Sequence, residues 1–171
     1  MNEVGLPPAS PIGGSFDLVD HHGRRVTDAA YRERYVLIFF GFTNCRVVCP
    51  RALTRLSAAL DLLGPLADRI QPLYITVDPD RDTPEAMQVF LRSYPRFVGL
   101  TGSKEQIDRV KGEFRVFARR ISDPDDFDGA TIRHTAIAYV MGPDGRYVSH
   151  FTDTSSSEET ADRLRTLLAL A

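Results

Sequence analysis

The chain has 171 residues, of which 43% are hydrophobic and 26% are charged. These values are typical of one soluble globular domain and exclude a fibrous, collagen-like or wholly disordered chain. The net charge of −2 gives no reason to expect nucleic acid or an anionic membrane surface as a partner. The only two cysteines, Cys45 and Cys49, exclude a disulfide-rich scaffold.

The N-terminal part of the sequence predicts a linker followed by a β-hairpin. Residues 5–14 (GLPPASPIGG) are rich in Pro, Gly and Ser, so we assign residues 1–14 to a linker and residues 15–171 to one domain. The sequence has no run of 18 apolar residues, so no transmembrane helix is predicted within it. Alternating residues at Phe16–Val19, before the turn at His22-Gly23, predict a hairpin over residues 16–27.

Two strands that are buried on both faces come next, with a helix between them. Residues 36–42 (VLIFFGF) are continuously apolar and residues 70–77 (IQPLYITV) largely so, which is typical of central strands. Leucines at helical spacing between these strands predict a helix over residues 50–63.

Capping signals indicate three further helices. Thr83-Pro84 opens the first of them. Ser103 and Gln106 form a capping box for the second, and Ser155 with Glu158 caps the last. Each start is followed by apolar residues at helical spacing: Met87, Phe90, Leu91 and Tyr94; Ile107, Val110, Phe114 and Phe117; and Ala161, Leu164, Leu167 and Leu168.

The remaining segments complete the predicted sheet. Residues 119–133 are polar and read as a long loop, whereas residues 134–141 and 146–151 flank a Gly-Pro-Asp-Gly turn and predict an antiparallel hairpin. The order is therefore β-hairpin, β-α-β-α and β-β-α. It predicts an α/β protein with a thioredoxin-like fold, in which a central mixed sheet is flanked by helices and preceded by the N-terminal hairpin.

The spacing of the two cysteines is the main chemical signal. They stand in the stretch GFTNCRVVCP at residues 41–50, directly after the first buried strand. If the helix starts near Cys45, the two sulfurs lie about one turn apart, where they can bind one metal ion or form a disulfide. A helix N-terminus lowers the pKa of a cysteine, and both roles need a thiolate. Redox pairs usually have two residues between the cysteines rather than three, so a metal site, a redox pair and two buried apolar cysteines all stay open.

Two sulfurs leave a copper or zinc site short of ligands, so the four histidines are the next candidates. We interpret His21 and His22 as solvated turn residues, and His150 as a strand residue without a partner in sequence. His134 is expected to open a strand, and in thioredoxin-like folds the turn that enters this strand lies against the cysteine motif. Two cysteines and one histidine suit copper, as Cu(I) or Cu(II), and zinc less specifically.

With these residues assembled, the chain resembles the Sco/SenC family of copper-binding proteins from about Gly14 to Phe151. The resemblance rests on several motifs in order: GSFDLVD with Gly23, the stretch from Phe39 to Pro50 with its F-T-x-C-x-x-x-C-P motif, VDPDRDTP at 77–84, GLTG at 99–102, and His134-Thr135 with Tyr139 and GPDG at 142–145. No single motif is specific, but their combination is.

The resemblance implies a thioredoxin-like metallochaperone that binds one copper ion through Cys45, Cys49 and His134. It implies a role in assembling the binuclear copper site of cytochrome c oxidase, with the copper-bearing subunit or another copper chaperone as partner. The cysteines would form a disulfide when oxidised. Asp78 is a candidate weak ligand, or a residue that contacts a ligand without binding the metal, although a loop-ordering role is at least as well supported. Arg81 and Asp82 are interpreted as structural loop residues.

Two positions depart from the family pattern. Arg46 stands where the family usually has Pro, and Arg133 stands where an Asp commonly precedes the histidine. A cation close to the site would favour thiolates and a lower metal charge, and it would alter the docking of a partner. These departures bear on metal affinity and partner identity more than on the fold.

Two other activities compete with copper delivery. A thiol–disulfide oxidoreductase that reduces the cysteines of a copper-site protein would not need His134. A peroxidase of the peroxiredoxin kind would need a threonine three positions before its cysteine, but Thr43 stands two before Cys45. From the resemblance we expect a monomeric domain, tethered in the full-length protein to the outer face of the bacterial inner membrane. The mitochondrial inner membrane, facing the intermembrane space, is the alternative location.

Overall fold

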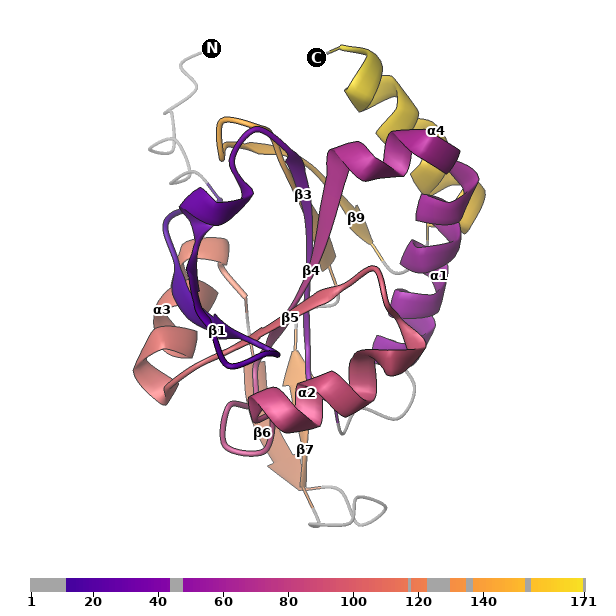
Figure 1. Ribbon diagram of the computed structural model, residues 1–171. Coiled ribbons are helices and arrows are strands. Elements are labelled where there is room, and N and C mark those ends of the chain that lie inside the picture. The colour runs from indigo at the N-terminus through magenta and orange to yellow at the C-terminus, as the bar shows by residue number, and fades with distance from the viewer. Residues whose placement is uncertain are drawn as a thin grey trace, which may run out of the picture.

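The structure is a computed structural model that describes residues 12–43, 48–116, 118–122, 130–134, 137–152 and 155–170. At residues 48–49, 118–122 and 130–134 it describes the backbone alone. A mixed β-sheet forms the middle layer, with helices α1 and α4 on one side and α3 on the other (Figure 1). This arrangement agrees with the predicted α/β class.

The main sheet has seven strands in the order β2-β1-β5-β4-β3-β8-β9. Strands β3, β4 and β5 run parallel to one another, whereas β8, β9, β1 and β2 pair antiparallel. The strands are β1 (Asp17–Asp20), β2 (Arg25–Thr27), β3 (Tyr35–Gly41), β4 (Ile70–Thr76), β5 (Val98–Thr101), β8 (Ile137–Met141) and β9 (Tyr147–Thr152). The predicted hairpins 16–27 and 134–151 are thus present, although β8 begins later than expected.

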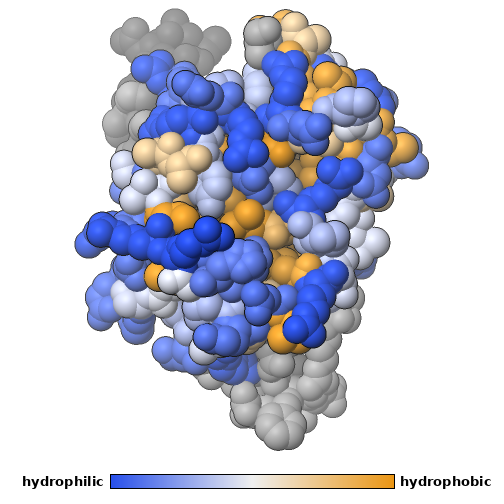
Figure 2. Space-filling view, viewed as in Figure 1, coloured by the Kyte–Doolittle hydropathy of each residue, from blue (hydrophilic) through white to orange (hydrophobic). Residues whose placement is uncertain are grey.

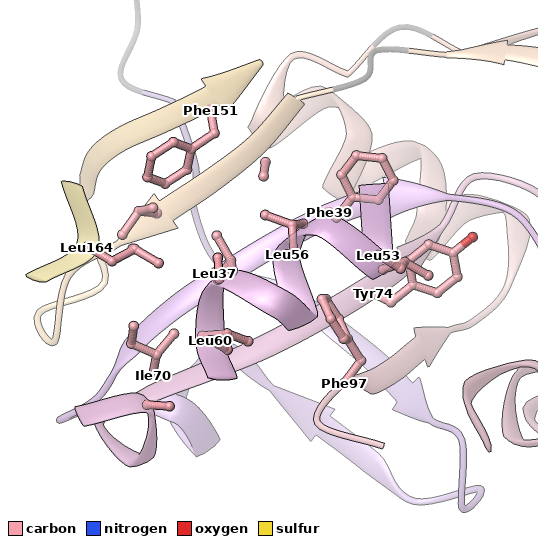
Figure 3. Close-up of a cluster of buried hydrophobic side chains, with 14 of the residues drawn as sticks. Leu37, Phe39, Leu53, Leu56, Leu60, Ile70, Tyr74, Phe97, Phe151 and Leu164 are labelled. Carbon is pink, nitrogen blue, oxygen red and sulfur yellow. The ribbon is translucent and has the colours of Figure 1, made fainter. Parts of the chain in front are cut away.

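Strand β3 separates two apolar cores. All seven of its residues are buried, as its continuous apolar sequence predicts. Successive side chains of a strand point to opposite faces, so Leu37 and Phe39 join the core beneath α1 and α4, and Ile38 and Phe40 join the core beneath α3. Figure 3 shows the first core, in which Leu53, Leu56 and Leu60 of α1 lie over β3 and β4. The two cores fix both faces of the strand that leads to the cysteines.

The helices follow the predicted segments closely. They are α1 (Val48–Leu62), α2 (Pro84–Phe90), α3 (Lys104–Phe114) and α4 (Ser157–Ala169), with 3-10 turns at η1 (Asp28–Tyr31), η2 (Gly64–Arg69) and η3 (Leu91–Ser93). The side chain of Thr83 caps α2, and the predicted capping box of Ser103 and Gln106 is present at α3. The last helix is capped by Ser156 rather than by Ser155, because the Ser156 side chain accepts from the backbone N–H of Glu159.

One loop prediction is wrong, and one strand was not predicted. The segment 119–133, expected to be a loop, instead contributes β6 (Ala118–Ser122) and β7 (Ala130–His134), which form a separate two-stranded antiparallel sheet. The Asp-Pro and Gly signals that suggested a loop fall mostly in residues 123–129, which lie outside the described residues. Strand β5 was also missed, because Val98–Thr101 is a four-residue segment that contains a glycine and pairs only with distant segments.

The surface on the face shown in Figure 2 is mainly hydrophilic, with apolar side chains emerging in separate groups. The exposed large apolar residues among those described are Leu62, Leu66, Val89, Val148 and Leu170. Among the described residues, no helix is both long and apolar enough to cross a membrane.

Candidate metal centre

The cysteine motif follows the carboxyl end of β3. The chain leaves β3 at Gly41, continues through Phe42 and Thr43, and enters α1 at Val48. Cys49 is therefore the second residue of α1, whereas Cys45 lies outside the described residues. The first turn of a helix carries unpaired N–H groups and the positive end of the helix dipole. The backbone of Cys49 thus stands in the first turn of α1.

His134 is the last residue of β7 and does not open β8, contrary to the prediction. Its backbone pairs with Ala118 of β6. Strand β8 then begins at Ile137 and pairs antiparallel with β3, with Ala138 opposite Phe39. The start of β8 consequently lies beside the carboxyl end of β3, so His134 reaches the same end of the sheet as the cysteine motif. The side chains of Cys45, Cys49 and His134 lie outside the described part.

Asp82 connects this end of the sheet to the residues just before the cysteines. Its side chain is fully buried, with 0% exposure. The backbone N–H of Thr43 donates to Asp82 Oδ2 at 3.0 Å, and the Thr43 hydroxyl donates to Asp82 Oδ1 at 2.5 Å. The hydroxyl of Thr76 also donates to Oδ2, at 2.6 Å. Burial raises the pKa of Asp82, and the hydrogen bonds from Thr43 and Thr76 oppose that rise.

Asp78, the candidate weak ligand, is engaged in the loop that follows β4. It is 2% exposed, and its Oδ2 atom forms an ion pair with Arg81 Nε at 2.5 Å. Its backbone N–H donates to the Thr76 hydroxyl, and its carbonyl accepts from the backbone N–H of Asp82 at 2.9 Å. These contacts support the loop-ordering interpretation of Asp78, and they also support the structural interpretation of Arg81 and Asp82.

Aromatic side chains pack at the start of α1 on the other side of the motif. Tyr94 Oη donates to the carbonyl of Pro50, the residue after Cys49, across 3.5 Å. Tyr94 packs on Phe90, and Phe90 stacks on Tyr74 of β4 with ring centroids 5.5 Å apart. The segment that carries the cysteines is thus held from the β4 side both before the motif, by Asp82, and after it, by Tyr94.

The other three histidines lie in two separate places. His22 is exposed, as expected, but His21 is half-buried and its Nδ1 atom accepts from the backbone N–H of Gly99 at 3.0 Å, which the solvated interpretation missed. His150 is exposed on β9 and hydrogen-bonds through Nδ1 to the hydroxyl of Tyr147, three residues away. The side chains described by the structure contain no group of three or more His, Cys, Asp or Glu that could hold a metal ion.

Comparison with known proteins gives one consistent result. A sequence model described as SCO1/SenC matches residues 5–169. Protein sco1 of Schizosaccharomyces pombe is 40% identical over 156 residues, and the SCO2-like protein RC0895 of Rickettsia conorii is 36% identical over 155. The matches cover 88% and 90% of this chain but 58% and 76% of those proteins, so the chain spans little more than half of the first relative.

Solved structures agree with the sequence comparison. Bradyrhizobium japonicum ScoI with copper bound is 41% identical, with a TM-score of 0.82 over 91% of this chain and 98% of that one. Arabidopsis thaliana ScoI with copper bound is 29% identical, with a TM-score of 0.88 over 94% and 99%. These likenesses confirm the predicted thioredoxin-like fold. Together with the family match over nearly its whole length, they show that this chain belongs to the SCO1/SenC family.

Proposed function

We propose that this chain is a metallochaperone that binds one copper ion through Cys45, Cys49 and His134 and helps to assemble the binuclear copper site of cytochrome c oxidase. The observation that carries the proposal is the likeness to Bradyrhizobium japonicum ScoI, a relative solved with copper bound. The match covers 98% of that relative and 91% of this chain. The oxidase role rests on the family: the structural neighbour BsSco is described as a member of the Sco family of cytochrome c oxidase assembly proteins.

The donor set fits copper in both oxidation states. Cu(I) prefers few soft ligands, and two thiolates satisfy it. Cu(II) favours an added imidazole nitrogen, which His134 would supply from the end of β7. Because the histidine and the cysteines come from different segments, the histidine could join or leave the site as the oxidation state changes. That behaviour suits an ion that must be passed on rather than held permanently.

The two cysteines also give the site a redox control. A disulfide between Cys45 and Cys49 would remove both thiolates, so only the reduced chain would take up copper. The same dithiol could instead reduce the cysteines of the oxidase copper site or of another copper-site protein. His134 separates the two functions, because thiol–disulfide exchange does not need an imidazole ligand.

The expected setting follows from the family resemblance. We infer that the full-length protein is tethered to the outer face of the bacterial inner membrane, with residues 1–14 as a linker and residues 15–171 as a monomeric copper-binding domain. Relatives named as mitochondrial, such as the human SCO1 homolog at 36% identity, support the mitochondrial inner membrane as the alternative. In either place the partner is the copper-bearing oxidase subunit or another copper chaperone.

Copper titration of the reduced protein tests the ligand set. Wild type and the variants Cys45→Ser, Cys49→Ser and His134→Ala are titrated with Cu(I) and with Cu(II), and binding and the thiolate–copper absorption are recorded. We expect both cysteine variants to lose stoichiometric binding of both ions and His134→Ala to lose Cu(II). His150→Ala is the matched control, because His150 is exposed on β9. If His134→Ala keeps wild-type Cu(II) affinity and absorption, the proposed site is wrong and the reductase function gains support.

A further inference from the structure

Three threonines from neighbouring strands converge on one buried carboxylate. Thr43 follows β3, Thr76 ends β4 and Thr101 ends β5, so all three stand at the carboxyl ends of adjacent parallel strands. Thr43 and Thr76 donate to the carboxylate of Asp82, and the hydroxyl of Thr101 donates to its backbone carbonyl at 2.7 Å. Asp82 is therefore fixed to three strands at the end of the sheet that carries the proposed copper site.

The Asp82 carboxylate accepts all of the hydrogen bonds described at its side chain. Thr43 contributes two donors, its backbone N–H and its hydroxyl, and the Thr76 hydroxyl contributes a third. The Thr76 hydroxyl oxygen accepts from Asp78 N–H, which leaves its own proton for Asp82. A carboxylate accepts from all three donors at once, whereas an amide in its place could accept from two of them at its oxygen and would require the Thr43 hydroxyl to turn and accept from its NH2 group.

The contact with Thr43 matters because of where that residue stands. Thr43 precedes Cys45 by two residues, and its backbone and side chain are both bonded to Asp82. Two bonds to Asp82 fix the orientation of Thr43 as well as its position. The bond from Thr76, in turn, fixes the carboxylate itself to β4.

We propose that Asp82 is a positioning residue for the cysteine motif, acting through Thr43 to set the path of the chain at Cys45. The inference rests on the proposed function in that the motif it positions is the proposed copper site. Asp82 itself is not proposed as a ligand. Its role would be to hold the thiol of Cys45 in one orientation, so that a copper donor and a copper acceptor meet the same site.

Thiol reactivity provides a test that needs no copper. The reduced, metal-free protein is alkylated with iodoacetamide, and the rate at each cysteine is followed by mass spectrometry. Thr43→Val removes the hydroxyl and keeps the backbone bond, whereas Thr43→Ser restores the hydroxyl. We expect Thr43→Val to raise the rate at Cys45 roughly fivefold, the equivalent of one lost hydrogen bond, and Thr43→Ser to return it close to the wild-type value.

Thr160→Val is the matched control for a general loss of stability. Thr160 lies in α4 and is fully buried, whereas Thr43 is half-buried, and the Thr160 hydroxyl donates to the backbone carbonyl of Ser156. We expect this variant to lower the free energy of unfolding without changing the rate at Cys45. An equal rise in Thr160→Val and Thr43→Val would overturn the proposal, because the effect would then follow from stability alone.

The variant Asp82→Asn distinguishes an effect of the Thr43 contact from an effect of the buried negative charge of Asp82. We expect it to raise the rate at Cys45 in the same direction as Thr43→Val, since it removes an acceptor from the three donors. A change in Asp82→Asn with none in Thr43→Val would show that the buried charge acts on the thiol, and would also overturn the proposal. If Asp82→Asn does not fold, the Thr43 pair decides alone. A wild type that binds no copper would refute the proposed function and leave these rates as an independent result.

Discussion

The Nδ1 atom of His21 accepts a hydrogen bond from the backbone N–H of Gly99, so a side chain extends the pairing of β1 with β5 beyond the strand itself. Backbone pairing between these strands joins Val19 to Thr101 and Asp20 to Leu100. His21 adds one more link where the chain turns away toward β2. The contact requires Nδ1 to be unprotonated, which makes the attachment of the N-terminal hairpin sensitive to pH.

This contact predicts a pH dependence of stability with a defined sign. Burial, followed by the neighbouring His22, lowers the pKa of His21 below its ordinary value of 6.5, with smaller effects from Asp20 and Arg24. The unfolded chain therefore binds the proton more readily than the folded chain. The contribution of neutral His21 is fully present above pH 6.5 and is lost as the pH falls through the lower pKa of the folded state.

Urea unfolding followed by circular dichroism, from pH 8 down to roughly pH 5, measures this effect across the range in which histidine titrates. We expect His21→Gln to show a shallower fall in unfolding free energy than wild type, because glutamine does not titrate. His150→Gln is the control, since His150 is exposed on β9 and is not among the groups that shift the pKa of His21. Identical pH profiles for wild type and His21→Gln would refute the role given to this contact.

The parts of the fold that local sequence encodes were predictable, and those that depend on distant partners were not. Strand β3 was evident because VLIFFGF is apolar throughout, and a strand buried on both faces needs that pattern. Strand β5 has four residues and takes its place from β1 and β4, so no local signal identified it. The β6–β7 pair was missed for a different reason: its two strands pair with each other, but the Asp-Pro and Gly residues between them suggested a loop.

The candidate site also has features that the sequence could predict and features that it could not. The cysteine spacing and the order of the strands predict that His134 lies near the cysteine motif, and this stays a prediction; the structure shows that His134 ends β7 instead of opening β8. The contact of Asp82 with Thr43 was not predictable, because it joins residues 39 positions apart in sequence. Asp82 could be assigned to a structural loop from its motif, but only the structure shows which residues it holds.

The start of α4 gives a prediction that separates two neighbouring serines. The Ser156 side chain accepts from the backbone N–H of Glu159, so Ser156→Ala should lower the free energy of unfolding by about 1 kcal/mol. Ser155→Ala should have little effect, because Ser155 is not the N-cap in the structure. Chemical denaturation of both variants measures the difference. A larger loss for Ser155→Ala would favour the start that the sequence suggested.

Gly99 offers a test of packing between β5 and α2. A Cβ atom at this position would lie 2.7 Å from Leu91 Cδ1 and 3.0 Å from Met87 Cε, and both side chains are buried. Gly99→Ala should therefore lower the unfolding free energy by about 1–3 kcal/mol through overpacking. Gly112→Ala is the control: Gly112 is exposed within α3 with open space around it, so alanine should stabilise by about 0.5–1 kcal/mol. Equal effects of the same sign in the two variants would contradict this account.

The ion pair of Asp78 and Arg81 predicts a strong and non-additive effect on stability. Asp78 is 2% exposed and the Arg81 side chain 19%, so Arg81→Met would remove the Arg81 cation from a buried carboxylate. We expect a loss of about 3 kcal/mol in unfolding free energy, at the lower end for a buried pair because Arg81 keeps some contact with water. The double variant Asp78→Asn/Arg81→Met should lose less than the sum of the two single variants, since it removes both charges together.

Lys104→Met provides the comparison with an exposed pair. Lys104 and Asp108 are 74% and 50% exposed, and solvent screens their attraction, so the expected loss is below about 1 kcal/mol. Urea unfolding of all four variants at neutral pH gives the coupling energy directly. Strict additivity of Asp78→Asn and Arg81→Met would show that their contact contributes nothing to the loop after β4. The ordering of that loop, which also carries Asp82, would then have to come from its other contacts, among them the threonine hydroxyls and the backbone hydrogen bonds to the Asp78 carbonyl.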